Sequence, residues 1–105
     1  MVNKTRKEQI VDMVAANPTD PELVYFLAME HKSAGETDLA VKRLKDAVGM
    51  APDYVPPYVQ LGQLLTELER EDEARLAYIN GIAAARKKGD THAAEEMAAF
   101  LESLG

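Results

Sequence analysis

The residues of this chain that could carry out acid–base or metal chemistry are few, and their spacing is poor for it. The two histidines are His31 and His92. His92 lies one helical turn from Glu95 and Glu96, a spacing that could hold a metal ion on a helix face. A solvated helix start beside acidic side chains explains these residues more simply, so we predict no metal site. His31 falls on the buried face of its helix, and we expect it to be packed and hydrogen-bonded.

Other residue types also give no support to a catalytic site. The chain has no cysteine, which excludes disulfides, thiolate metal sites and cysteine nucleophiles. It has no nucleophile elbow and no glycine-rich phosphate loop. The acidic residues 67–73 lack the glycine and the spacing of a calcium loop, and the basic residues 86–88 have no interleaved aromatic residues and fit a helix C-terminus. The sequence therefore predicts no enzyme, no cofactor and no catalytic residue.

Composition and charge narrow the class of protein further. The chain has 105 residues, the size of one domain, and its 18 acidic and 12 basic residues give a net charge of −6. This acidic balance argues against a nucleic-acid partner. No stretch approaches the roughly 20 apolar residues of a membrane span, and Asp12 interrupts the only candidate for a signal-peptide core. These features predict a cytoplasmic protein with no membrane partner.

Apolar residues follow helical spacing along nearly the whole chain. Thr5 and Glu8 have the spacing of a capping box, Gly35 fits a helix end in a left-handed conformation, and Gly89 breaks the fifth helix. The first helix places Ile10, Met13 and Val14 on one side. Short connections make consecutive helices antiparallel neighbours, so the predicted fold class is all-α. The predicted helices cover residues 5–16, 21–34, 38–50, 56–68, 71–88 and 90–104.

Similar residues recur at a fixed distance of 34 positions. Leu27 and Leu61 are 34 positions apart, and so are Ala40 and Ala74. Small residues stand where paired helices must approach closely, and large ones stand beside them. The small residues are Ala28, Ala40, Ala47, Gly62, Ala74 and Gly81.

This pattern resembles the tetratricopeptide repeat family, whose unit is a helix–turn–helix of 34 residues. Residues 55–88 fit the family motif well, and residues 21–54 fit it with Ala28 in place of the usual Gly and His31 in a slot that is normally aromatic. Arg86 stands where the motif has Pro. The motif residues of the better repeat are Tyr58, Leu61, Gly62, Leu65, Ala74, Tyr78 and Gly81.

The flanks resemble halves of the same unit. Residues 5–16 match its second helix, with Arg6 in place of a small Ala, and residues 90–104 match its first helix after a shift of two residues. The resemblance implies a single α-solenoid domain over residues 1–105, similar to small bacterial-type members with two full repeats and two partial ones. The last helix is expected to cap one end of the stack.

In this family the first helices of successive repeats line a concave groove that binds a peptide or helix of a partner. The resemblance thus implies a scaffold or adaptor for an unidentified protein, with both apolar and polar groove positions and with Glu95 favouring a basic partner. Chaperone-binding members clamp a C-terminal carboxylate with Lys, Asn and Arg, a set that this groove lacks. The predicted groove residues are Tyr25, Met29, Lys32, Val59, Gln63, Thr66 and Glu95.

Two alternatives stay open at this point. Tyr25 and Met29 could pack against the first helix and partly fill the groove. The protein could also have a structural role through self-association as a homodimer, in which apolar end faces of the repeat stack bring two copies together.

Overall fold

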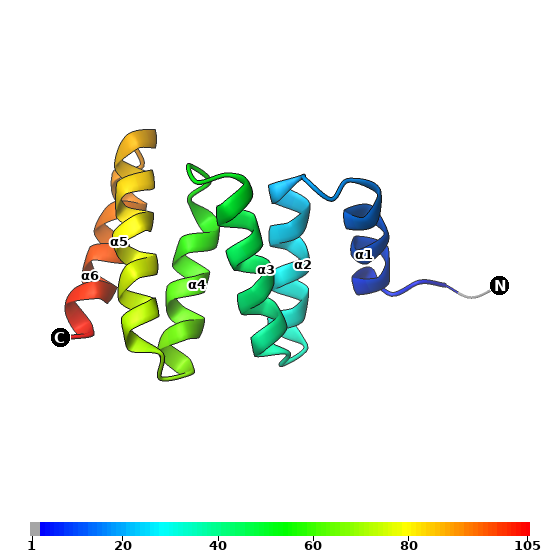
Figure 1. Ribbon diagram of the computed structural model, residues 1–105, viewed down its shortest axis with the longest axis horizontal. Coiled ribbons are helices and arrows are strands. Elements are labelled where there is room, and N and C mark those ends of the chain that lie inside the picture. Colours follow the sequence, from blue (N-terminus) through cyan, green and yellow to red (C-terminus); the bar gives the residue numbers. More distant parts are fainter. Residues whose placement is uncertain (1–2) are drawn as a thin grey trace.

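The computed structural model describes residues 3–105, and within that range it contains six α-helices and no strand (Figure 1). The predicted all-α fold is confirmed, and each predicted helix bound lies within two residues of the observed one. The helices are α1 (Arg6–Ala16), α2 (Pro21–Ser33), α3 (Thr37–Met50), α4 (Pro56–Glu67), α5 (Glu71–Lys88) and α6 (Thr91–Ser103).

Local sequence signals set the helix ends. Thr5 and Glu8 form the expected capping box, in which each side chain accepts a hydrogen bond from the backbone N–H of the other. The Asp20 and Asp90 carboxylates cap α2 and α6. Gly89 ends α5 with φ +73°, in the left-handed region that glycine adopts without steric cost.

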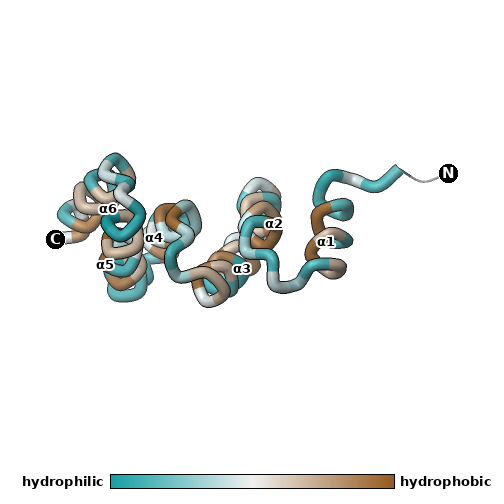
Figure 2. The backbone as a smooth tube through the Cα atoms, turned by 90° about the horizontal axis from the view of Figure 1, so that it is seen from above, coloured by the Kyte–Doolittle hydropathy of each residue, from teal (hydrophilic) through white to brown (hydrophobic). Residues whose placement is uncertain are grey.

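The helices form two layers in an elongated stack. Figure 2 shows α2, α4 and α6 on one side of the stack and α3 and α5 on the other. Extensive helix contacts join only neighbours in the chain, and the extents of the molecule are 52 × 28 × 19 Å. Because each helix packs mainly against its neighbours, stability is approximately a sum of units and interfaces, as in other solenoids.

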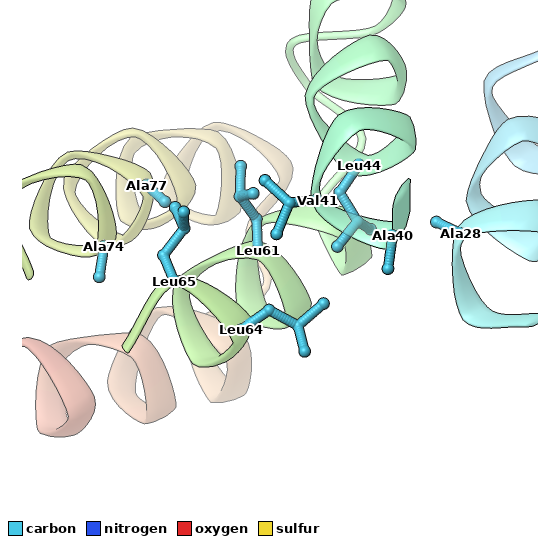
Figure 3. Packing of buried hydrophobic residues seen from close by; sticks show 9 residues of the cluster. All are labelled: Ala28, Ala40, Val41, Leu44, Leu61, Leu64, Leu65, Ala74 and Ala77. Atoms are coloured by element: carbon cyan, nitrogen blue, oxygen red, sulfur yellow. The ribbon is translucent and has the colours of Figure 1, made fainter. Parts of the chain in front are cut away.

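Two clusters of buried side chains run along the interior. One joins α2, α3, α4 and α5 and contains Ala28, Leu44, Leu65 and Ala74 (Figure 3). The other joins α4, α5 and α6 and includes Tyr78. All six small residues named above are buried, which confirms the alternation of small and large side chains between paired helices.

The first helix is held more loosely than its apolar side predicts. Ile10 is its only buried residue, whereas Met13 is 48% exposed, so the expectation that Met13 shares the packed side with Ile10 is wrong. Two ion pairs add to the contact with the next repeat. Arg6 Nε lies 2.7 Å from Glu30 Oε1, and Lys7 pairs with Glu36.

Candidate functional site

The predicted groove residues come from the layer formed by α2, α4 and α6, which we call the first-helix surface. Tyr25, Met29 and Lys32 lie on α2, and Val59, Gln63 and Thr66 lie on α4. Figure 2 shows α2 and α4 in the same layer, so both sets of residues belong to that layer.

Tyr25 is half-buried and lies against Tyr54, a residue of the segment between α3 and α4. The two rings meet edge to face, with centroids 5.8 Å apart and planes at 80°. Burial raises the pKa of both phenols, and the nearby carboxylate of Glu22 raises that of Tyr54 further. Tyr25 therefore packs against the connection at the end of its own repeat, a partner different from the first helix that the sequence offered as the alternative. Sequence reasoning missed Tyr54 because a residue in a turn has no helical spacing.

Lys32 connects the two repeats across this surface. Its Nζ donates a hydrogen bond to Gln60 Oε1 at 2.7 Å, which joins α2 to α4. Met29 and Val59 are half-buried, and Val59 packs against the second cluster of buried residues. These three side chains thus combine contact within the solenoid with partial exposure.

A hollow of about 400 Å³ lies between α4 and α6 and has a mixed polar and apolar lining. Gln63, Thr66 and Glu67 line it from α4, and Phe100, Ser103 and Leu104 line it from the α6 side. The Phe100 ring stacks on Tyr78 with centroids 5.7 Å apart, which fixes its orientation. The Gln63 amide carries both a donor and an acceptor, so it can pair with a peptide backbone while an apolar side chain lies on Phe100.

Glu95 lies on another face. It lines a hollow at the end of the stack together with Arg86, Thr91 and Ala98. The structure therefore does not bring Glu95 together with Gln63 and Thr66. The assignment of Glu95 from spacing already allowed for the two-residue shift of α6, so the repeat register alone does not determine which face this side chain occupies.

A larger hollow, of about 680 Å³, lies where three connections meet, and sequence reasoning did not find it. Two of its carboxylates, those of Asp20 and Asp90, already cap helices. Residues from three separate connections form it, so no single motif could reveal it. Its charged residues are Asp20, Glu22, Asp53, Lys88 and Asp90.

The expectation for His31 is confirmed. Its side chain is buried, and Nδ1 lies 3.1 Å from Glu36 Oε1. The Lys7 ammonium, followed by His31, holds the pKa of Glu36 below its usual range. Across residues 3–105, no three His, Cys, Asp or Glu side chains gather closely enough to hold a metal ion. In that same range, none of the helices has the length and apolar character needed to cross a membrane.

Comparison with known proteins gives a consistent result. A family model described as tetratricopeptide repeat matches residues 55–88. The crystal structure of a tetratricopeptide repeat domain protein from Salinibacter ruber superposes with a TM-score of 0.76, and its sequence is 33% identical to this one. The match covers 81% of this chain and 94% of that one. A protein from Bordetella parapertussis, solved in solution, is 26% identical, with a TM-score of 0.79, over 97% of this chain and 89% of that one.

Two further comparisons complete the picture. MamA shares the fold, with a TM-score of 0.70 and 20% sequence identity. That match covers 93% of this chain and 64% of MamA. No curated protein sequence matches the chain. The 34-residue period, the six helices and the Salinibacter relative together show that this chain belongs to the tetratricopeptide repeat family.

Proposed function

We propose that the chain is a cytoplasmic adaptor without catalytic activity, which binds a peptide or helix of one partner protein on the first-helix surface. The tetratricopeptide repeat fold supports a protein–protein interaction module in general. The finer proposal assigns binding to the hollow beside Gln63 and Thr66 and to the exposed parts of Tyr25, Met29, Lys32 and Val59.

The observation that carries the proposal is the mixed polar and apolar lining of the hollow between α4 and α6. Gln63 and Thr66 offer hydrogen bonds, while Phe100 is fixed by its stacking on Tyr78. Thr66 Oγ1 already donates to the Gly62 carbonyl at 2.8 Å, so its remaining capacity is to accept a hydrogen bond from a partner. This combination fits an extended segment with one apolar side chain, because the backbone and the side chain are bound on opposite sides of the hollow.

The proposal is tested by changing Gln63 to Arg, which fills the hollow without removing a core contact. The variant and the wild type are immobilised and used to capture proteins from the native lysate. A partner bound by the wild type and lost by Gln63→Arg places binding in this hollow.

The matched control is Asn80→Arg. Asn80 also carries a carboxamide in the middle of a helix, but it is exposed, whereas Gln63 is half-buried, and it lies on α5, in the other layer. We expect the control to retain the partner. A partner that the control loses while Gln63→Arg retains it contradicts the proposal and assigns binding to the opposite layer.

Exposed apolar residues at the two ends of the stack favour a second candidate, self-association. Met13 and Val11 are exposed on α1, and Ile79 is exposed on α5. A repeat stack with apolar residues at both ends has two surfaces that a further helix can cover.

A further inference from the structure

An apolar groove runs between α5 and α6 at the end of the stack, and we call it the end groove. Its walls are largely aliphatic, it has a volume of about 550 Å³, and Ile79 on its edge is 48% exposed. In the described part of the chain, residues 3–105, no helix packs over it. Its lining residues are Ile79, Ile82, Ala83, Arg86, Ala98, Leu101 and Glu102.

The end groove is the counterpart of the site that holds the second helix inside each repeat. With the shift of two residues, Ala98 of α6 corresponds to Gly62 of α4, and Leu101 corresponds to Leu65. Gly62 is covered by the Tyr78 ring of α5, and Leu65 packs in the same cluster as Ala74 of α5. Ala98 is exposed in the end groove. The groove therefore has the form of a seat for a second helix of the repeat.

Within residues 3–105, α1 corresponds to the second helix of a repeat and has no first helix of that repeat beside it. Ile10 and Met13 of α1 stand 68 positions, or two repeat lengths, before Tyr78 and Gly81 of α5. In the second repeat, Gly81 lies between Met97 of α6 and Tyr58 of its own first helix. The same position on α1 is Met13, which is about half exposed, and among residues 3–105 the only extensive helix partner of α1 is α2.

We propose that α1 of a second copy of this chain occupies the end groove of the first. The α6 helix of one copy and the α1 helix of the next then form one complete repeat, which makes the self-association candidate specific. Because the two surfaces are different, the contact is head to tail and leaves both outer ends free for further copies.

The sizes of the facing side chains are complementary at this junction. In the second repeat, each facing pair combines a small residue with a larger one: Gly62 with Tyr78, and Gly81 with Tyr58. At the junction, Ala98 takes the place of Gly62 and Ile10 that of Tyr78. Ala94 takes the place of Tyr58, and Met13 takes the place of Gly81. In this pair the larger residue is on α1 and not on the first helix, so one small and one large side chain still face each other.

The charges at the junction are complementary as well. The second helices of the two repeats, α3 and α5, are joined by an ion pair between Lys45 and Glu73, whose atoms lie 3.1 Å apart. If the 34 positions of each repeat are numbered from its start, the position of Glu73 is six lower than that of Lys45. Pro52 and Asn80 have the same relationship and line one hollow. This relationship places Arg86 of the end groove opposite Asp12 of the second copy. Both side chains are exposed, and Asp12 forms a surface ion pair with Lys4 of its own helix end.

Arg6 is the one large departure, because it takes the position of the buried Ala74. Arg6 is exposed, and its ion pair with Glu30 lies at the surface. Glu102 follows Leu101, the residue that faces this position, and lines the end groove. Its carboxylate offers the guanidinium a counter-charge at the junction.

Sedimentation velocity on the full chain tests the proposal, at concentrations up to about 1 mM. We expect the wild type to grow beyond the dimer as its concentration rises. Met13→Glu blocks the α1 surface and Ala98→Glu blocks the end groove, and each is expected to weaken association at least tenfold. A mixture of the two variants is expected to form a one-to-one dimer that grows no further, because each retains one intact surface.

Met50→Glu is the matched control, since Met50 is an exposed methionine on a helix away from both surfaces. It is expected to associate like the wild type, and circular dichroism checks that all variants keep their helices. A second pair of variants, Arg86→Asp with Asp12→Arg, is expected to weaken association singly and to restore it together.

Three results overturn the proposal: a wild type that stays monomeric, growth that stops at a dimer, or variants that fail to pair when mixed. None of them bears on the first-helix surface, because Gln63 lines neither of the two surfaces involved. Conversely, Gln63→Arg is expected to lose partner binding while its self-association stays unchanged. The two measurements therefore test the two proposals separately.

Discussion

The Tyr78 ring lies against the backbone of Gly62, so closely that a Cβ atom on Gly62 would lie 2.3 Å from Tyr78 Cε1. This contact brings α4 and α5 together in the second repeat. The first repeat has Ala28 and Leu44 at the same positions, both fully buried. A smaller residue on one helix is thus matched by a larger one on the other, and the two repeats solve the packing with different pairs.

Gly62→Ala is therefore expected to destabilise the protein by about 1–3 kcal/mol, because the added methyl group displaces a buried aromatic ring. Urea denaturation followed by circular dichroism measures the change. Gly49→Ala is the control. Gly49 lies near the end of α3, where an added methyl group would have nothing within 4 Å, and replacing it should leave stability unchanged or raise it by up to ~1 kcal/mol.

The two positions are also expected to be coupled. In a Tyr78→Leu background, which reproduces the large residue of the first repeat, Gly62→Ala should cost less than it does in the wild type. A double-mutant cycle measures the difference. An equal loss in both backgrounds would show that the added methyl group acts through the α4 backbone and not through the ring.

A surface ion cluster between repeats is expected to make stability depend on acid pH. Arg70, followed by Lys45, donates to the Glu73 carboxylate, and these bonds lower its pKa to about 2 from an ordinary 4.5. Because the pKa of Glu73 is lower in the folded state than in the unfolded state, its ion pairs stabilise the protein fully at pH values above the unfolded-state pKa. That contribution falls as pH drops from about 4.5 towards 2, where the folded carboxylate becomes protonated.

The measurement compares the melting temperatures of the wild type and Glu73→Gln across this range. The wild type should be the more stable at pH 7, and the difference should shrink as pH falls from 4.5 to 2. High salt should reduce the difference at pH 7, because the group is exposed to solvent. A difference that is constant with pH would mean that Glu73 acts through packing alone.

Local signals explain why the helices could be predicted well. The caps at Thr5, Asp20 and Asp90 and the glycine at Gly89 act within one turn of the chain, so the sequence around them is sufficient. The repeat supplies the long-range pairing, because a motif that recurs must repeat its contacts.

The features that sequence reasoning missed all depend on contacts without a local signal. Tyr54 reaches Tyr25 from a connection between repeats. Met13 has an apolar side chain in a regular helical position, but the first helix that would cover it is absent from residues 3–105. Spacing assigns Glu95 to the groove, whereas in the structure it lines a different hollow together with Arg86 and Ala98.

Peptides with an acidic C-terminus are expected to show no measurable binding. The groove positions Tyr25, Met29 and Val59 carry no cation, and the Lys32 ammonium is already bonded to Gln60. A carboxylate on this surface therefore lacks a charged partner. Calorimetry with such a peptide at about 1 mM should give only the heat of dilution, and a saturable heat would refute the assignment.

Removing α6 is expected to abolish cooperative unfolding, because this helix completes the second cluster of buried residues. Met97 is fully buried against α5, and Phe100 covers Tyr78 by stacking. A truncation to residues 1–88 exposes Tyr78 to water and leaves the buried Gly81 uncovered. We expect a broad thermal transition for this truncation, measured by circular dichroism. Met97→Ala in the full chain should keep a sharp transition but lose about 2–5 kcal/mol, since it leaves a cavity where the truncation removes a whole interface. A truncation that melts as sharply as the full chain would show that the second repeat is stable without α6.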